Sequence, residues 1–266
     1  MSTCVVSLGV NGSTPSDHPK AVFQDYSRGI ARIRKGLAKA GFRGEFLSWY
    51  QQYPDGSPTA REAPFAFKPF CFSVARKQGY RLVLWMDAGI RVKQSLDPLF
   101  ESIERRGYLF FPERRRVGEF CKDDALGPLG ITREESFAIP SCWAGVVGLD
   151  FKSPPAVEFL RLCKERAVDG VTFPGPKWSG VGDWPRIASQ DPRVKGHRYG
   201  QTATSVIASR LGMNEWESKE LCVRFLAQDP GFVRRYRGES RTMSIPKPWS
   251  AFATPWIFRR ATYQPK

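Results

Sequence analysis

The 266-residue sequence lacks a long hydrophobic run, and its first residues do not show a charged segment followed by an apolar one. A membrane-spanning helix needs about 20 mostly apolar residues, and a signal peptide needs the second pattern. We therefore expect no membrane span, no signal peptide and a cytoplasmic location. Hydrophobic residues make up 41% of the chain and aromatic residues 13%, which is typical of a globular protein and not of a disordered one.

Motifs of several large enzyme classes are also absent. The sequence contains no G-x-S-x-G, no G-x-x-x-x-G-K-[ST] and no G-x-G-x-x-G. The sequence therefore gives no motif evidence that the protein is a serine hydrolase of the α/β type, a P-loop enzyme or a Rossmann dinucleotide enzyme. The cysteines are scattered without C-x-x-C spacing, which favours buried free thiols in a reducing compartment over a zinc site. The six are Cys4, Cys71, Cys121, Cys142, Cys163 and Cys222.

Acidic residues are scarce relative to basic ones, with 26 Asp and Glu against 41 Lys and Arg and a net charge of +15. Such an excess favours a polyanionic partner, which could be nucleic acid, an anionic membrane surface or a phosphorylated ligand. The alternative is that the charge serves solubility alone. A solvated helix face explains two of the basic clusters, around Arg34 and around Arg105. The other clusters are Arg114, Arg115 and Arg116, expected in a loop near a functional edge; Arg234, Arg235 and Arg237; and Arg259 and Arg260.

Short apolar runs bounded by turn residues alternate with segments whose apolar residues recur at helical spacing. This alternation predicts an α/β fold with a mostly parallel central sheet flanked by helices. The tail after residue 224 is basic, aromatic and rich in proline, and we expect it to be irregular. The expected strands are 4–9, 45–50, 82–86, 90–92, 108–111 and 142–151, and the expected helices are 26–40, 67–78, one that begins at 97, 121–126, 154–167 and 201–211, with a long irregular loop over 170–197.

A carboxylate follows the fully apolar expected strand Leu82–Met86. In open α/β sheets ligands collect just beyond the carboxyl ends of the strands, so Asp87 is placed to meet a ligand or a metal. The alternative is that Asp87 is only a turn residue in Asp87-Ala88-Gly89, since Asp and Gly are ordinary turn residues. The first strand ends in a similar way, because glycines and Asn11 interrupt it directly after Leu8, which is a common entry to a nucleotide site.

Three segments, in this order, resemble the glycosyltransferases of the GT-A type, which transfer sugars from nucleotide diphosphates. They are FKPF with LVLWMDAGIRV, then SCWAGVVGLDFKSPPAVEFL, then GHRYGQTATSVIASRLGM. In that family the first segment ends in an Asp-x-Asp element that holds a divalent metal, the second lines the acceptor side, and the third carries a His-Arg-x-Asp-Gln element. The resemblance covers about residues 5–213. It implies a GT-A-like catalytic domain over 1–222, with residues 223–266 as a basic aromatic extension packed on it.

The resemblance also implies the site residues for a nucleotide-sugar donor, which we expect to be UDP-linked. Donor-binding residues would be Gly9, Asn11, Lys68, Asp87, Gly89, Arg91 and Arg198, and catalytic residues would be Asp87, His197 and Gln201. Mn²⁺ or Mg²⁺ would bind Asp87 and His197, since these ions prefer oxygen ligands and substrate phosphates. The sequence departs from the family at Gly89 and Gly200, which stand where the family has aspartates. Lys68, Arg91 or Arg198 could therefore carry the diphosphate charge without a metal.

The acceptor is predicted from the positive charge and the aromatic basic tail, which suit DNA. The hypothesis is that a 5-hydroxymethylated pyrimidine in DNA is glycosylated, as in phage DNA hypermodification, which would place the protein in the host cytoplasm. The alternatives are a saccharide or lipid-linked acceptor at an anionic membrane, and a non-catalytic nucleic-acid-binding protein on a degenerate transferase scaffold. Acceptor-side residues would be Trp143, which could instead fill the core, Gly145, Arg114, Arg115, Arg116, Arg234, Arg235 and Arg237, with Asp150, Asp183 and Asp191 as candidate bases.

Overall fold

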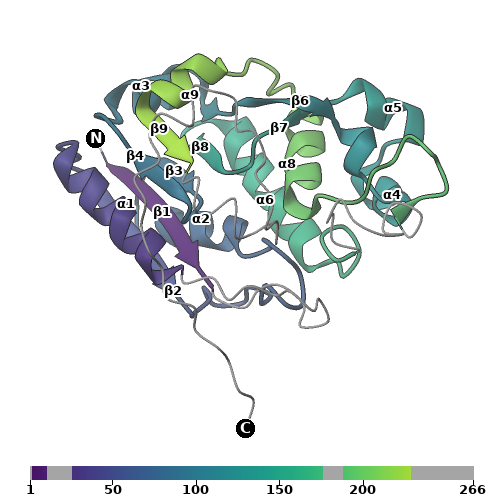
Figure 1. The fold of residues 1–266 in the computed structure, drawn as a ribbon, viewed down its shortest axis with the longest axis horizontal. Coiled ribbons are helices and arrows are strands. Elements are labelled where there is room, and N and C mark those ends of the chain that lie inside the picture. Colours follow the sequence, from purple (N-terminus) through teal and green to yellow (C-terminus); the bar gives the residue numbers. More distant parts are fainter. Residues whose placement is uncertain (1, 11–25, 176–187, 229–266) are drawn as a thin grey trace, which may run out of the picture.

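The computed structural model describes residues 2–10, 26–175 and 188–228 (Figure 1). Strands and helices alternate along most of this length. The elements are β1 (Thr3–Gly9), α1 (Ser27–Lys39), β2 (Glu45–Tyr50), α2 (Lys68–Lys77), β3 (Leu82–Met86), β4 (Ile90–Val92), α3 (Asp97–Arg106), β5 (Tyr108–Leu109), β6 (Pro112–Arg116), two 3-10 turns (Val117–Phe120 and Asp123–Ala125), α4 (Leu126–Leu129), α5 (Arg133–Ala138), β7 (Pro140–Cys142), β8 (Val146–Asp150), α6 (Pro154–Val168), α8 (Tyr199–Arg210), α9 (Lys219–Phe225) and β9 (Leu226–Gln228).

The central sheet has five strands in the order β2-β1-β3-β8-β5. Strand β1 pairs in parallel with β2 and with β3, whereas β8 pairs antiparallel with β3 and with β5. Four of the five strands therefore run in one direction, and only β8 is reversed. The predicted α/β fold with a mostly parallel central sheet is confirmed.

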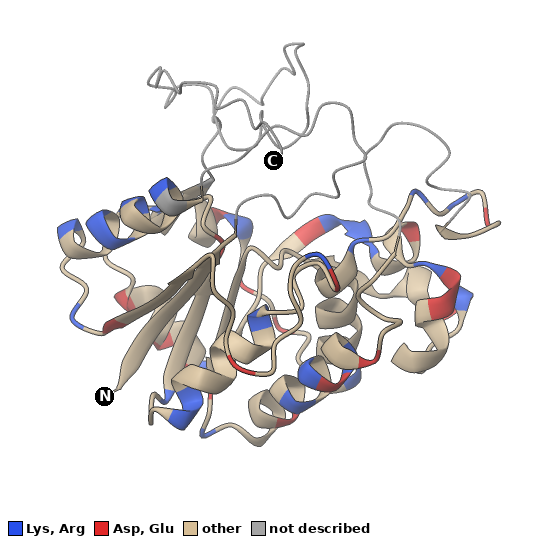
Figure 2. Ribbon diagram, turned by 90° about the horizontal axis from the view of Figure 1, so that it is seen from below, with Lys and Arg blue, Asp and Glu red and all other residues tan. Residues whose placement is uncertain are grey.

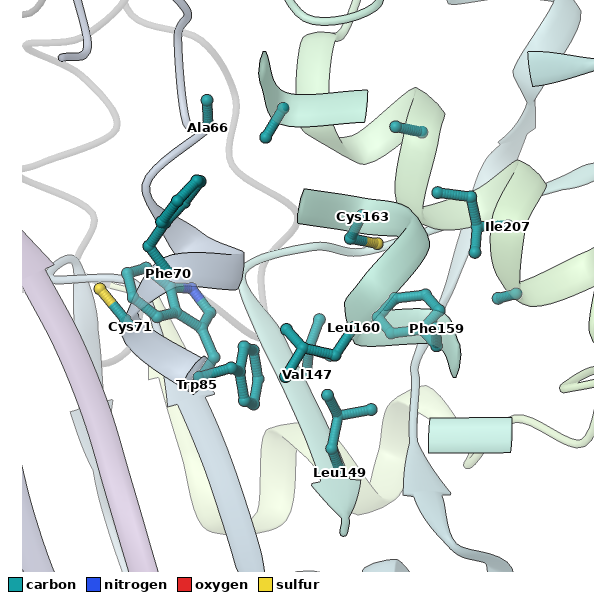
Figure 3. Packing of buried hydrophobic residues seen from close by; sticks show 14 of the residues in the cluster. Ala66, Phe70, Cys71, Trp85, Val147, Leu149, Phe159, Leu160, Cys163 and Ile207 are labelled. Atoms are coloured by element: carbon teal, nitrogen blue, oxygen red, sulfur yellow. The ribbon is translucent and has the colours of Figure 1, made fainter. Parts of the chain in front are cut away.

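Strand β3 is buried on both faces of the sheet, which explains why its sequence is continuously apolar and does not alternate. Leu82, Leu84 and Met86 join the hydrophobic cluster under α1, α3 and α9. Val83 and Trp85 point to the opposite face and join the cluster under α2, α6 and α8. Figure 3 shows this second cluster, in which Trp85 and residues of β8 lie beside residues of α6. Helices therefore cover both faces of the sheet.

The structure differs from the sequence-based expectations in four places. The strand expected over 142–151 begins only at Val146, because residues 143–145 form a turn after β7. Arg114, Arg115 and Arg116 belong to β6, which pairs antiparallel with β7, and not to a loop. The helix expected over 121–126 is a 3-10 turn followed by the short helix α4. Residues 219–228, which we expected to be irregular from 224 onward, form α9 and β9, and β9 pairs with β4. The predicted domain boundary after residue 222 falls within α9 and stays a prediction.

All six cysteines are buried free thiols, as predicted. Burial raises the pKa of Cys4, Cys121 and Cys142 to about 12, so these thiols are protonated at neutral pH. The thiolate is the nucleophilic form of cysteine, and these positions therefore do not suit nucleophilic catalysis. Among the described residues, no helix has the length and apolar character needed to span a membrane.

Candidate functional site

Asp87 lies directly beyond β3, at the edge where β1, β2 and β3 end, which we call the carboxyl edge. Its backbone N–H donates to the carbonyl of Gly145 at 2.8 Å, and its own carbonyl accepts from the N–H of Ile90 at 2.9 Å. Helix α1 packs closely on the same turn, because a Cβ at Gly29 would lie 2.2 Å from the carbonyl oxygen of Ala88. The backbone around Asp87 is thus fixed from three sides.

The carboxylate of Asp87 is anchored through one oxygen only. Its Oδ1 accepts from Lys68 Nζ and from Trp85 Nε1, each at 2.7 Å. Lys68 Nζ also donates to the carbonyl of Ala144 at 2.8 Å and lies 5.2 Å from the ring centre of Phe65. Within the described part of the chain Oδ2 has no hydrogen-bond partner, and the Asp87 side chain is 38% exposed. One oxygen therefore orients the group, and the other is left for a ligand.

The turn between β7 and β8 lies beside Asp87 and carries Trp143 and Gly145. A Cβ at Gly145 would lie 2.7 Å from Cε2 of Trp143, so the indole packs on the glycine backbone. The backbone N–H of Trp143 donates to the carbonyl of Phe111 at 2.7 Å. Trp143 is half-buried and packs against the cluster under α1, α3 and α9, so it is a core residue with one part exposed near the carboxyl edge.

A second polar group lies at the start of α8. Glu113 Oε2 accepts from Arg198 Nη1 at 2.5 Å and from Gln201 Nε2 at 3.0 Å. Gln201 Nε2 also donates to Ser141 Oγ at 3.0 Å, and the side-chain Oε1 of Gln201 has no partner within the described part of the chain. Arg198 and Gln201, both expected from the sequence, are therefore brought together.

Glu113 and Ser141 were not expected from the sequence. Along β6 the side chains of Glu113 and Arg115 are half-buried, whereas Pro112, Arg114 and Arg116 are exposed. This alternation of two is a property of the folded strand. The sequence Pro-Glu-Arg-Arg-Arg contains no apolar alternation, so no sequence signal would have separated Glu113 from its neighbours.

The two polar groups border the same region. Ser141 contacts Gln201 and Ala144 contacts Lys68, and three residues of chain span at most about 11 Å. In addition, the rings of Phe65 and Tyr199 lie 6.1 Å apart between the starts of α2 and α8. We call the combined group the edge site; it consists of Lys68, Asp87, Glu113, Trp143, Arg198 and Gln201.

Backbone strain is concentrated at the same edge. Among the described residues, three non-glycine residues have positive φ: Gln51 at 56°, Phe65 at 64° and Tyr199 at 47°. Gln51 follows β2 and donates its N–H to the carbonyl of Gly9 at the end of β1, and the other two flank the starts of α2 and α8. Such conformations cost on the order of 1 kcal/mol each and are frequent at ligand sites.

His197 is fully buried, and both of its ring nitrogens have backbone partners. Nε2 donates to the carbonyl of Thr172 at 2.9 Å, and Nδ1 accepts from the N–H of Lys122 at 3.4 Å. Burial lowers the pKa of His197 to about 4, so the ring is neutral at pH 7. A metal would have to displace one of these hydrogen bonds, and the geometry therefore favours a structural role for His197.

Among the described residues, no three His, Cys, Asp or Glu side chains are grouped where they could hold an ion, so the described donor set at Asp87 does not fit a metal held by the protein. The ammonium of Lys68 lies 2.7 Å from Asp87 and already neutralises that carboxylate. We therefore derive no step that uses Mn²⁺ or Mg²⁺.

The remaining expected donor residues have mainly backbone roles or lie nearby. A Cβ at Gly9 would approach Tyr26 Cβ to 2.9 Å, so this glycine permits the start of α1 to pack on β1. Gly89 is buried in the turn after Asp87, and Arg91 is half-buried in β4. Asn11 lies outside the described residues.

Of the expected acceptor arginines, Arg115 shares a ring contact with the edge site: its guanidinium is 5.0 Å from the ring centre of Phe120, which Arg198 approaches to 5.5 Å. Arg114 and Arg116 are exposed, and Arg116 donates to the carbonyl of Ala138 at 3.0 Å. Arg234, Arg235 and Arg237 lie outside the described residues.

No protein-family model matches the chain, and no curated protein sequence matches it. Among solved structures, it is similar to a glycosyltransferase involved in the glycosylation of the major capsid of PBCV-1, with 12% identity over 90% of this chain and 97% of that chain and a TM-score of 0.44. It is also similar to the glycosyltransferase GlyE of Streptococcus pneumoniae (13% identity, 83% of this chain and 45% of that chain, TM-score 0.38) and to mouse xyloside xylosyltransferase 1 (12%, 79% and 82%, 0.35). At these values the similarity concerns the path of the chain, and we infer no activity from it.

Proposed function

We propose that this protein is a glycosyltransferase that moves a sugar from a nucleoside diphosphate sugar, with UDP as the expected nucleotide, to a hydroxyl acceptor. The observation that carries the proposal is the half-satisfied carboxylate of Asp87 at the carboxyl edge, where α/β proteins bind ligands. The three segments that resemble the GT-A family contribute Asp87, Trp143 and Gln201, and all three residues border the edge site. A chance resemblance of short segments would not be expected to converge on one site.

The edge site offers the groups that such a transfer needs. A nucleoside diphosphate leaves with negative charge, which preorganised cations stabilise as the glycosidic bond breaks. Lys68 and Arg198 would supply these cations, and their ion pairs with Asp87 and Glu113 hold them in place. The open oxygens, Asp87 Oδ2 and the side-chain Oε1 of Gln201, would accept hydrogen bonds from sugar hydroxyls.

The favoured acceptor in this proposal is a 5-hydroxymethylated pyrimidine in DNA. The net charge of +15 supports a polyanion, because phosphate contacts supply salt-sensitive affinity. A saccharide or lipid-linked acceptor at an anionic membrane is the alternative within the same reaction. The non-catalytic alternative has its own observation: a Cβ at Gly200 would lie 2.7 Å from the ring of Phe173, so the aspartate that the family has there does not fit.

The test is to incubate the protein with duplex DNA containing 5-hydroxymethylcytosine and a mixture of UDP-sugars, with and without Mn²⁺. The DNA is then digested to nucleosides and analysed by mass spectrometry, while released UDP is measured in parallel. A gain of one sugar mass on the modified nucleoside, absent from unmodified DNA, is the expected result. UDP release without that gain would support the proposed transferase activity and indicate that the acceptor is a saccharide or a lipid-linked saccharide instead of DNA. If no UDP is released and no mass is gained while DNA binding is intact, the transferase proposal is overturned and the protein is a non-catalytic DNA-binding protein.

A further inference from the structure

Helix α1 carries positive charge and no negative charge on its outer surface. Between residues 26 and 44 the chain has six cations and no acidic residue. Ile30, Ile33 and Leu37 are buried against the sheet, which turns the charged positions outward. Figure 2 shows Lys and Arg along this helix without Asp or Glu. The cations are Arg28, Arg32, Arg34, Lys35, Lys39 and Arg43.

Four of these cations form one stripe. Arg28, Arg32, Lys35 and Lys39 follow at steps of four, three and four residues, which places them on a single helix face. Like charges at this spacing destabilise a helix. Of the remaining two, Arg34 lies 5.2 Å from the ring centre of Phe46, whereas Arg43 is exposed beyond the end of α1. The arrangement is unfavourable for the isolated helix, so the solvated face that the sequence led us to expect around Arg34 does not by itself explain it.

Helix α6 shows how a solvated charged helix is built in the same protein. Arg161 pairs with Glu158 at 2.7 Å and with Glu165 at 2.9 Å. Arg166 pairs with Glu165 at 2.6 Å and with Asp169 at 3.3 Å. Both arginines of α6 are neutralised within the helix and at its end, and Lys164 lies 5.0 Å from the ring centre of Phe70. Helix α1 has no acidic residue to serve in this way, and its exposed Lys35 and Lys39 have no ion pair with any described residue.

The stripe begins at the edge site and runs away from it. Near the start of α1, Gly29 contacts Ala88, which directly follows Asp87. Further along, a Cβ at Gly36 would lie 3.0 Å from Val92 Cβ, so α1 runs beside the chain that leaves Asp87. A helix of 13 residues is about 20 Å long, a length over which each strand of a DNA duplex presents about six phosphates.

We infer that the outer face of α1 binds the phosphate backbone of a DNA duplex and guides it to Asp87. This inference deepens the proposed function and rests on it for the identity of the acceptor. Direct contact with phosphates explains why the face carries cations alone, since each contact contributes affinity without reading sequence. Bases would then be presented at the carboxyl edge, where the hydroxyl acceptor must lie.

The experiment compares two triple variants of the full chain. In the first, Lys35→Gln, Lys39→Gln and Arg43→Gln remove three exposed cations of the α1 region. In the matched control, Lys77→Gln, Lys152→Gln and Lys164→Gln remove the same charge from the end of α2, the end of β8 and α6. Binding to a 24-base-pair duplex is measured between 50 and 300 mM NaCl, and binding to vesicles containing phosphatidylserine is measured alongside.

The α1 variant is expected to bind the duplex about ten- to a hundredfold more weakly at 100 mM NaCl, with a salt dependence of log K reduced by about 2 to 3. The control variant should keep the wild-type slope. An unchanged slope in the α1 variant, or an equal loss in both variants, would overturn the inference. Loss of vesicle binding with duplex binding intact would also overturn it, in favour of a membrane surface.

UDP release in the absence of DNA separates this inference from the proposed function. The α1 substitutions lie outside the edge site, so donor hydrolysis should be unchanged in both triple variants. If the wild-type protein releases no UDP but the α1 variant loses duplex binding, the surface is correct and the enzyme proposal fails. If UDP is released and the α1 variant binds the duplex as tightly as the wild-type protein does, the enzyme proposal stands and the inferred DNA-binding surface is wrong.

Discussion

Two aspartates lie at opposite edges of the central sheet and differ in how fully their oxygens are used. Asp150, at the end of β8, is 4% exposed and accepts from Arg81 Nε at 3.0 Å, Arg81 Nη2 at 2.8 Å and the N–H of Lys152 at 2.9 Å. Asp87, beyond β3, is 38% exposed and uses only Oδ1. A saturated carboxylate holds the fold together, whereas a half-saturated one retains capacity for a ligand.

Strand direction is the physical origin of this difference. The antiparallel register pairs Leu82 with Asp150 and Met86 with Val146, so β8 ends where β3 begins. Ligands bind at the carboxyl ends of the parallel strands, and the reversed strand delivers its terminal aspartate to the other edge. Each aspartate follows an apolar strand in the sequence, and only the topology separates their roles.

The largest expected effect is on turnover in Asp87→Asn. The amide keeps the shape of the side chain but removes the charge that holds Lys68 and the open carboxylate oxygen. We expect UDP release, with or without an acceptor, to fall by about a hundredfold or more, as for other preorganised charged groups. The melting temperature should change by no more than about 4 °C, because the ion pair is partly exposed.

Asp97→Asn is the matched control for this substitution, because Asp97 is an exposed aspartate in the first turn of α3 whose carboxylate accepts from Ser95 Oγ. Its turnover should equal that of the wild-type protein. Full turnover in Asp87→Asn would remove the distinction between the two edges of the sheet. A large loss of stability in Asp87→Asn would make this residue structural, like Asp150.

The sequence is sufficient to predict the local parts of this site. The apolar run Leu82–Met86 marks β3 and Asp87 follows it, so the sequence places this carboxylate at a strand end, and the topology decides which edge of the sheet that end joins. The partner pairs that complete the site are distant in sequence: Glu113 meets Arg198 across 85 residues and Gln201 across 88. Periodicity describes one segment at a time, and such contacts depend on how segments pack.

One wrong expectation and one unresolved choice have the same cause. The loop expected at Arg114–Arg116 is the strand β6, because its pairing with β7 outweighs the low strand propensity of consecutive arginines. Asp150 was one of three candidate bases, because the sequence does not reveal that Arg81 occupies both of its oxygens. Charge and propensity are local quantities, whereas saturation of a carboxylate is a property of the fold.

His197 extends the comparison between groups with and without open hydrogen-bonding atoms. It was expected in the site, but both of its ring nitrogens have hydrogen-bond partners, as both oxygens of Asp150 do. The pKa of His197 is lowered from 6.5 to about 4. Between these pH values the ring is protonated in the unfolded chain but stays neutral in the folded protein. The stability that this residue contributes is complete above pH 6.5 and is lost as the pH falls. We expect the free energy of unfolding to drop by about 2 kcal/mol between pH 7 and pH 5 and by about 3 kcal/mol by pH 4.

Urea unfolding at pH 7, 6 and 5 measures this loss, and His197→Asn is the comparison. The variant should be less stable at pH 7 but lose less on acidification to pH 5. Other groups act at lower pH: the pKa of Asp191 is lowered to about 2 by its hydrogen bonds with Arg193, so its contribution is lost only below about pH 4. If the variant and the wild-type protein lose the same unfolding free energy on acidification, His197 must take up its proton in the folded protein as readily as in the unfolded chain.

The smallest expected effect is at Asp150, at the edge of the sheet opposite the carboxyl edge. Asp150→Asn removes the charge from a buried carboxylate that Arg81 contacts twice, and we expect a loss of about 1–2 kcal/mol in the free energy of unfolding. Arg81 also pairs with Glu104 at 2.9 Å, but Glu104 is 39% exposed, so Glu104→Gln should cost less. Urea unfolding of both variants checks this order, and UDP release should stay at the wild-type rate in each. If Asp150→Asn instead lost turnover and kept its stability, a saturated carboxylate would be the functional one, and the number of open oxygens would not identify a site in this fold.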